Sequence, residues 1–306
     1  MRRFLLWCAR NRWLRTHIPR LPGAQRAVRR FMPGETMDDA LRAAGTLQAG
    51  GLPSIFTRLG ENLADLAQAD EVVAHYHELI GRFARWGLHP DVSPKLTQLG
   101  LDHDPDATVD HAVELARHAA AVGSRLWIDM EDSSYVDRTL DAYERVLEAQ
   151  PGVGLCLQAY LRRTPADVER LLPLGAGVRL VKGAYNEPAS VAFRDKGEVD
   201  EAYLGLAVAM LPAAADGGLR LGLGTHDVEL VERIAEAGAA QGIGKEAFEV
   251  QMLYGIRADQ QRRLQAEGYR VRILIAYGEY WYPWYVRRLA ERPANLWFAM
   301  RQMIPW

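Results

Sequence analysis

The segment of residues 178–187, with the sequence VRLVKGAYNE, joins an apolar strand to two cationic side chains. Because side chains alternate across a β-strand, Arg179 and Val181 should share one face and Lys182 should point to the other. Charged side chains are seldom buried without a partner. The two cations therefore indicate either an anionic ligand or a salt bridge with an acidic residue at the end of the strand.

Other apolar runs carry polar side chains at or near their ends. These side chains are Glu61, Lys95, Asp129, Gln158, Thr225, His226, Gln251 and Tyr277. His226, Asp227 and Asp129 could bind a divalent ion, but His226 belongs to no H-x-H or H-E-x-x-H motif, and we expect no metal. Lys95 or Lys182 could instead form a Schiff base, as in a barrel lyase.

A second pair of cations follows an aromatic stretch near the C-terminal end. Arg287 and Arg288 are adjacent, and Glu291 comes four and three residues after them, so the three side chains can share one helical face. Two adjacent guanidinium groups can bind the oxygens of a small carboxylate. We expect Glu291 to hold the two arginines in place.

Eight short apolar runs alternate with stretches of helical period, which predicts repeated βα units. The runs cover residues 52–59, 92–99, 125–128, 153–157, 178–181, 219–224, 248–253 and 271–276. Eight such units favour a (β/α)8 barrel, in which the polar strand ends meet at one end of the barrel. A dinucleotide-binding fold is disfavoured because residues 222–227 lack the third glycine of G-x-G-x-x-G.

The first 34 residues contain nine arginines and no acidic residue. This segment could lie on an anionic membrane surface, or it could pack on the domain as a helical arm. Thr36 is well placed to cap a helix that starts just after it. We therefore divide the chain into an N-terminal basic helical arm, residues 1–45, and a catalytic barrel, residues 46–306.

The composition limits the class of function. The chain has 37 basic and 39 acidic residues and a formal net charge of −2, which argues against a dedicated nucleic-acid binder. Cys8 and Cys156 are too few for a disulfide framework and favour a reducing compartment. No apolar run approaches the roughly 18 to 20 residues of a spanning helix. We expect a cytoplasmic protein that the basic arm could bring to the inner face of the cytoplasmic membrane.

Taken together, these residues resemble the proline dehydrogenase family in its short monofunctional bacterial form. The matching stretches are GET at 34–36, LGE at 59–61, Lys95, ID at 128–129, QAY at 158–160, RLVKGAY at 179–185, TH at 225–226, EVQMLYG at 249–255 and RRLAER at 287–292. The resemblance implies a distorted (β/α)8 barrel, with the last helix over the barrel mouth and FAD bound without a Rossmann domain.

The resemblance also implies roles for individual residues. The flavin would be held by Gln158, Arg179, Val181, Lys182, Gly183, Ala184, Thr225 and His226. The substrate carboxylate would be bound by Lys95, Arg287 and Arg288, with Glu291 orienting the arginines. Asp129, Tyr185 and Leu253 would line the substrate pocket, and Glu61 would pair with Arg287 to close it.

The reaction implied is oxidation of L-proline to Δ1-pyrroline-5-carboxylate, with a hydride passing from C5 to flavin N5 and electrons passing to a quinone. It would be the first step of proline catabolism to glutamate, with a functional link to pyrroline-5-carboxylate dehydrogenase. One departure stands out, because Leu274 and Ala276 replace the Tyr and Pro of the family's Tyr-x-Pro-x-Gly pattern. This change suggests hydroxyproline or another cyclic imino acid as the substrate. A barrel that has lost catalysis and serves as a scaffold is a third alternative.

Overall fold

The computed structural model describes residues 7–8, 11–20, 24, 28–60 and 63–291. Its strands are β1 (Ser54–Arg58), β2 (Asp91–Val92), β3 (Trp127–Ile128), β4 (Gly154–Gln158), β5 (Gly177–Val181), β6 (Arg220–Gly224), β7 (Phe248–Leu253) and β8 (Arg270–Tyr277). All pair in parallel, in the order β2-β1-β8-β7-β6-β5-β4-β3. Isolated bridges Val92–Leu126 and Lys95–Asp129 join the two outer strands and close the barrel. The predicted (β/α)8 barrel is confirmed.

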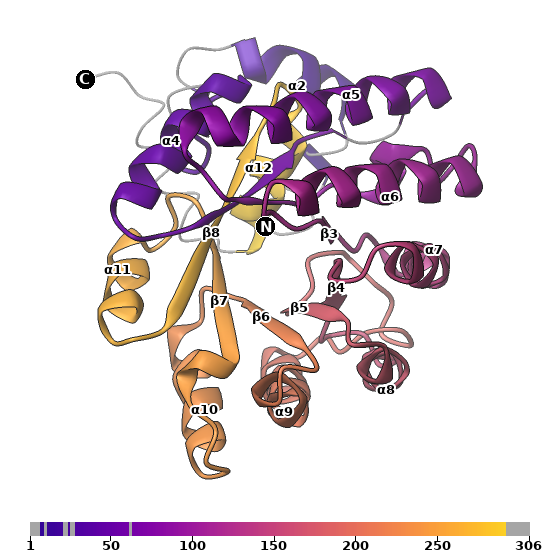
Figure 1. The fold of residues 1–306 in the computed structure, drawn as a ribbon. Helices are drawn as coiled ribbons and strands as arrows, with labels where there is room; N and C mark the ends of the chain where they lie inside the picture. Colours follow the sequence, from indigo (N-terminus) through magenta and orange to yellow (C-terminus); the bar gives the residue numbers. More distant parts are fainter. Residues whose placement is uncertain (1–6, 9–10, 21–23, 25–27, 61–62, 292–306) are drawn as a thin grey trace.

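Helices surround the strands, as Figure 1 shows. The helices between consecutive strands are α5 (Leu66–Phe83), α6 (Pro105–Ala121), α7 (Val136–Ala149), α8 (Thr164–Leu171), α9 (Lys196–Ala215), α10 (Val228–Ala239) and α11 (Ala258–Ala266). Outside this repeat, the described part of the chain includes α2 (Arg12–His17) and α4 (Met37–Ala49) before β1, and α12 (Trp281–Glu291) after β8. In the described part of the chain, no helix combines the length and the apolar character needed to cross a bilayer.

The start of α4 is fixed by its sequence. Thr36 accepts a hydrogen bond from the backbone N–H of Asp39, and the Asp39 carboxylate accepts one from the backbone N–H of Thr36. This capping box satisfies two N–H groups that a helix end otherwise leaves free, and it confirms Thr36 as the predicted cap. The helix buries one face in the main core and runs across residue 45, so the predicted domain boundary falls inside a single helix.

The interior of the barrel is polar, whereas its outer face is apolar. Leu180 is fully buried against the helices, and its neighbour Arg179 points into the barrel, which confirms the predicted alternation along this strand. Small residues make room for large ones inside. A Cβ atom on Gly154 would lie 2.2 Å from the indole ring of Trp127, so only glycine fits beside this tryptophan.

The run at residues 92–99 was expected to be one strand, and this prediction is only partly correct. The strand β2 consists of Asp91 and Val92, and residues Leu96–Leu99 form a 3₁₀ helix. Pro94 cannot donate to a strand ladder. Because the apolar residues that follow are buried on all sides, their pattern does not distinguish a strand from a helix.

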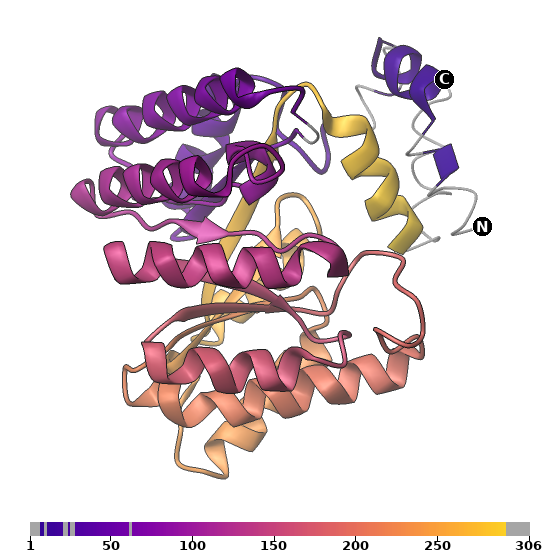
Figure 2. The same cartoon turned by 90° about the vertical axis from the view of Figure 1, so that its right-hand side faces the viewer.

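Helix α12 lies over the carboxyl ends of the strands, beside the N-terminal segment (Figure 2). The buried aromatic side chains of α12 form a second apolar cluster with Ala24, Val28 and Met32. The indole N–H of Trp281, which is fully buried, donates a hydrogen bond to Glu35 at 2.8 Å. The described part of the arm is therefore packed on the domain, and the predicted position of the last helix is confirmed.

Candidate active site

A cavity of about 490 Å³ opens at the carboxyl ends of the strands. It brings together the predicted residues Lys95, Asp129, Gln158, Arg179, Val181, Lys182, Gly183, Ala184, Tyr185, Thr225, His226 and Leu253. Glu61 lies outside the described residues. The side chains of Arg287, Arg288 and Glu291 are also outside them, although their backbone belongs to α12. The predicted residues thus come from six strands, β2 to β7, and the loops that follow them, and they meet in one pocket.

The centre of the cavity floor is an ion pair between Arg179 and Asp129. The guanidinium group also donates a hydrogen bond to the hydroxyl of Ser93 at 2.6 Å, and this hydroxyl donates to Asp129 at 2.9 Å. Burial lowers the pKa of Arg179, but the charge of Asp129 and smaller contributions from Cys156 and Asp91 together outweigh this effect, so the pKa lies above its ordinary value. Arg179 is therefore a fixed positive charge at the bottom of the pocket.

Below this ion pair, Trp127 fills the barrel. The guanidinium groups of Arg179 and Arg220 each lie 5.2 Å from its ring, which allows cation–π attraction to both. Its indole N–H donates to Asp91 at 2.9 Å. This tryptophan separates the cavity at the carboxyl ends of the strands from the opposite end of the barrel.

Several buried polar atoms in this pocket have no hydrogen-bond partner among the described residues. They are Oε1 of Gln158, Nη1 of Arg179 and Oε1 of Gln251. Buried polar groups in native proteins are nearly always hydrogen-bonded, so these atoms indicate a polar ligand. In the turn after β5, the backbone of Gly183 packs directly against the ring of Tyr160. Its φ is 114°, and a Cβ atom there would lie 2.2 Å from that ring, so the position requires glycine.

Lys95 differs from the other cations of the pocket. Among the described residues, its ammonium group takes part in no hydrogen bond or ion pair, and its backbone forms a bridge with Asp129. An ammonium group that is available at the wall of a pocket is suited to bind a carboxylate.

Lys182 is held by carboxylates of the protein. Its ammonium group pairs with Asp227 at 2.7 Å and with Asp200 on α9. Burial raises the pKa of Asp227, but the hydrogen bond and charge of Lys182, with smaller contributions from Leu230 and Lys196, together outweigh this effect and the pKa is lowered. Lys182 therefore anchors the turn after β5 to α9, and its engaged amine does not favour the Schiff-base alternative.

His226 and Leu253 are joined directly. The backbone N–H of Leu253 donates to Nε2 of His226 at 3.3 Å. Arg257, which has a positive φ of 52°, donates to the carbonyl oxygen of His226 at 2.8 Å. These contacts fix the loop that follows β6 against the end of β7. In the described part of the chain, no group of three His, Cys, Asp or Glu side chains is arranged to hold a metal ion.

The last strand places Leu274 at the wall of the cavity and Tyr277 away from it. Tyr277 packs against Phe56 and contacts Nε2 of His75 through its hydroxyl group at 2.7 Å, on the outer face of the barrel. Tyr277 does lie at the end of its strand, but the alternation of the strand turns its side chain outward, so it does not contribute to the pocket. The cavity has no aromatic ring at the position of Leu274.

Some residues of the pocket were not found from the sequence. Ser93 bonds to both members of the central ion pair, and Cys156, Met130 and Trp284 line the cavity. Trp284 could have been found, because it belongs to the aromatic stretch before Arg287. The other three carry no distinctive motif, and only the barrel geometry identifies them.

The fold and the pocket define a (β/α)8-barrel enzyme with a cationic site at the carboxyl ends of its strands. A family model described as proline dehydrogenase matches residues 40–301. The proline dehydrogenase of Deinococcus radiodurans is 38% identical over 281 residues, which cover 90% of this chain and 89% of that protein. Proline dehydrogenase 1 of Bacillus subtilis is 33% identical over 304 residues, which cover 99% of each chain. The chain belongs to the proline dehydrogenase family and is an enzyme of proline oxidation in proline catabolism.

Solved structures support the same fold. The structure described as proline utilization A from Bdellovibrio bacteriovorus, inactivated by N-propargylglycine, superimposes with a TM-score of 0.79 at 23% identity. The match covers 94% of this chain and 38% of that longer one. The likeness confirms the barrel architecture.

Proposed function

We propose that this enzyme oxidises L-proline to Δ1-pyrroline-5-carboxylate with bound FAD. The observation that carries the cofactor proposal is the set of buried polar atoms without a protein partner, on Gln158 and Arg179, beside the tight turn at Gly183. An isoalloxazine ring offers hydrogen-bond donors and acceptors at its edge, which these atoms could satisfy. The residues present therefore fit the flavin that the family implies.

The residues that would hold FAD are Gln158, Arg179, Val181, Lys182, Gly183, Ala184, Thr225 and His226. When bound, FAD supplies the hydride acceptor, its N5 atom, for the hydride that leaves C5 of proline. Lys182 would contribute through its ion pairs with Asp200 and Asp227, which hold the turn, rather than through a contact of its own. Ser93 would contribute by orienting Arg179.

The substrate is a small zwitterion, and the proposed carboxylate site is cationic. Lys95 has an ammonium group available at the cavity wall. Arg287 and Arg288 would complete the site from α12, with Glu291 orienting the two guanidinium groups. Glu61 would pair with Arg287 to exclude water. Asp129, Tyr185 and Leu253 would form the wall beside the ring, and placing the reacting carbon correctly is the main task of these residues.

A second candidate substrate is 4-hydroxyproline. It is favoured by Leu274, which lines the cavity where the family pattern has a tyrosine. Leucine offers no hydroxyl group and leaves room for a substituent on the substrate ring. The same chemistry would then act on a wider set of cyclic imino acids.

The proposed electron acceptor is a quinone, which would require contact with a membrane surface. Trp7 and Trp13 are 57% and 63% exposed, and both belong to the basic arm. Tryptophan and basic side chains together suit the interface of an anionic bilayer. We therefore propose a cytoplasmic enzyme that binds peripherally to the inner face of the membrane and delivers its product to a pyrroline-5-carboxylate dehydrogenase.

The first test is the visible absorption spectrum of the purified protein, followed by anaerobic addition of L-proline. A flavin band at about 450 nm that bleaches with L-proline but not with L-alanine, which has no ring, is the expected result. A colourless protein that FAD cannot reconstitute would overturn the cofactor proposal. In that case, borohydride trapping of Lys95 would test the Schiff-base alternative.

A further inference from the structure

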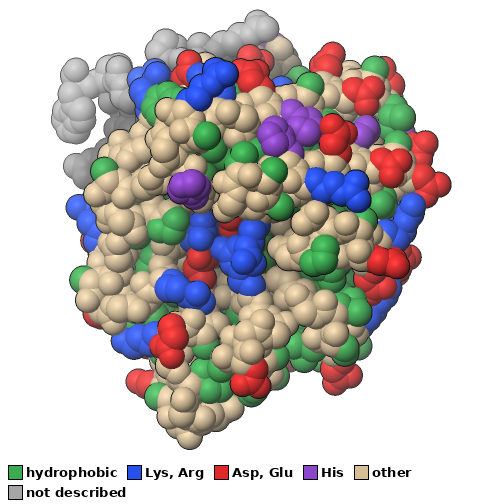
Figure 3. Space-filling model, viewed as in Figure 1, with side chains coloured by type: hydrophobic (Ala, Val, Ile, Leu, Met, Phe, Trp, Pro, Cys, Tyr) green, Lys and Arg blue, Asp and Glu red, His purple; other side chains and the backbone are tan. Residues whose placement is uncertain are grey.

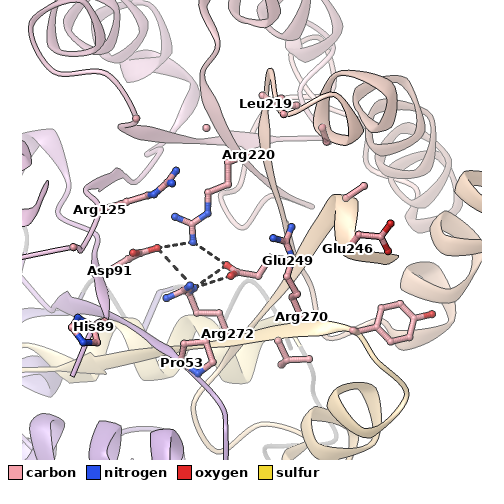
Figure 4. A pocket seen from close by; sticks show the side chains of 18 of the residues that line it. Pro53, His89, Asp91, Arg125, Leu219, Arg220, Glu246, Glu249, Arg270 and Arg272 are labelled. Carbon is pink, nitrogen blue, oxygen red and sulfur yellow. Dashed lines mark hydrogen bonds and ion pairs between the residues drawn. The ribbon is translucent and has the colours of Figure 1, made fainter. Parts of the chain in front are cut away.

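A second cavity, of about 780 Å³, lies at the other end of the barrel, where the strands begin. Figure 3 shows Lys and Arg side chains gathered near the centre of one face, and Figure 4 shows this cavity from close by. Four arginines line it, namely Arg125, Arg220, Arg270 and Arg272. Trp127 separates this cavity from the active site, so the site described above does not account for it.

Two of the four arginines are neutralised by buried carboxylates. Arg220 pairs with Asp91 at 2.9 Å, and Arg272 contacts both oxygens of Glu249 at 2.9 Å (Figure 4). Asp91 and Glu249 are 4% and 6% exposed. This network links β2, β6, β7 and β8 and is electrically balanced, so it forms a closed floor for the cavity.

The other two arginines are exposed at the rim and are not neutralised. Among the described residues, Arg125 has no hydrogen bond or ion pair, and Arg270 uses only its Nε atom, which donates to the carbonyl of Phe248 at 3.2 Å. Burial lowers the pKa of Arg125, and the neighbouring charge of Arg220 lowers it further. Glu246 is the one carboxylate at the described part of this rim, so positive charge is in excess there.

The starting end of barrel strands is usually a region of stability rather than binding. Arginines there commonly offset the negative ends of the barrel helices by donating to the last carbonyl groups. Arg125 makes no such bond in the described structure, although α6 ends only four residues before it, at Ala121. An exposed guanidinium group at the rim of a cavity, with no acceptor among the described residues, is available to a ligand.

We propose that this cavity binds a phosphate-bearing small molecule, with Arg125 and Arg270 donating to the phosphate oxygens. A planar guanidinium group can donate two parallel hydrogen bonds to a pair of phosphate oxygens. At this rim, the two arginines outnumber the one carboxylate, Glu246. The balanced floor leaves the rim charges free for this purpose. The volume is in the range of sites for organic ligands, so the phosphate could belong to a free ion or to a larger molecule such as a nucleotide. The proposal is independent of FAD and of proline.

The test is isothermal titration calorimetry on the full chain at constant ionic strength, with orthophosphate, pyrophosphate and adenosine monophosphate as probes. We expect saturable binding of at least one probe with one site per chain. The variants Arg125→Ala and Arg270→Ala should each weaken it about tenfold or more, because each loses a charge-assisted hydrogen bond. Arg262→Ala, which removes an exposed arginine of α11 outside the cavity, should bind as the wild type does.

The pattern of affinities distinguishes the sources of the phosphate. Equal affinity for orthophosphate and adenosine monophosphate identifies the phosphate group alone as the ligand, whereas a clear preference for adenosine monophosphate identifies a nucleotide. Unsaturable heats for all three probes would overturn the proposal. Binding that both rim variants retain would overturn it as well, since the probe would then occupy another site. Circular dichroism checks that the variants fold, and Arg125→Gln provides a second test.

Discussion

Arg179 and Asp129 form a buried ion pair in the middle of the barrel, with exposed side-chain fractions of 3% and 20%. The pair joins β5, the strand before the proposed flavin-binding turn, to Asp129 in the proposed wall of the substrate pocket. Its partner Ser93 holds both groups at once. One interaction thus contributes to the stability of the barrel and to the electrostatics of the pocket.

We predict that Asp129→Ala destabilises the protein by about 3 kcal/mol, because it leaves the Arg179 charge buried without a counterion. The free energy of unfolding in urea measures this directly. Ser93→Ala is the matched control, since it removes the hydroxyl group but keeps the ion pair, and it should cost about 1 kcal/mol. Equal losses of unfolding free energy in the two variants would show that the ion pair stabilises the protein no more than the Ser93 hydrogen bonds do.

We predict that Leu274→Tyr narrows the choice of substrate. The ring and hydroxyl group would fill space at the cavity wall, so kcat/KM for trans-4-hydroxy-L-proline should fall by about tenfold relative to that for L-proline. Steady-state kinetics on both substrates with the wild type and the variant provide the comparison. A wild type that already prefers L-proline as strongly as the variant does would contradict the role assigned to Leu274.

We predict that His75 makes the free energy of unfolding depend on pH. Burial, and then the charge of Arg58, lowers its pKa to about 4, below the ordinary value of about 6.5. In this pH range the unfolded chain binds a proton that the folded protein does not. The stabilising effect of the neutral ring is thus complete above about pH 6.5 and is lost as the pH falls toward 4.

The matching experiment compares the wild type with His75→Gln, whose amide can still contact the hydroxyl group of Tyr277. The wild type should lose more free energy of unfolding between pH 7 and pH 5 than the variant does, with a difference of up to about 1.4 kcal/mol per pH unit. Parallel pH profiles for the two proteins would exclude His75 as the titrating group.

We predict that the arm mediates membrane binding through Trp13, whose only described aromatic contact is a stacking on His17 at 4.4 Å. Trp13→Ser should reduce sedimentation with anionic phospholipid vesicles several-fold and leave activity with a soluble acceptor unchanged. Trp86→Ser is the control, because Trp86 is 39% exposed but lies after α5, outside the arm. Equal losses for both variants would mean that the arm has no particular part in binding.

The barrel and most of the pocket could be predicted because each strand leaves a local signal. An apolar run that ends in polar residues places those residues at the carboxyl end of a strand, and Arg179, Asp129 and His226 meet there for that reason. The directions of Arg179 and Tyr277 follow from alternation alone. Local sequence patterns are therefore sufficient to predict functional side chains that lie at the end of a regular strand.

The charged floor could not be predicted in the same way. Arg220, Arg272 and Glu249 lie at the starts of strands and look like ordinary solvated residues in the sequence. Their pairing depends on which side chains of neighbouring strands meet inside the barrel, as does the fit of Trp127 beside Gly154. Such partners become visible only when the barrel closes.

The closure of the barrel is uneven around its circumference. Between β2 and β3 the ring is held by the isolated bridges Val92–Leu126 and Lys95–Asp129. The ladders β1–β2 and β3–β4 contain two residue pairs each, whereas β4–β5 and β7–β8 contain five. The barrel should therefore open most easily at β2 and β3, where neighbouring strands share the fewest backbone hydrogen bonds. Lys95 and Asp129 form one of the two bridges between β2 and β3, so a small widening there would move the cation proposed to bind the carboxylate away from the proposed pocket wall.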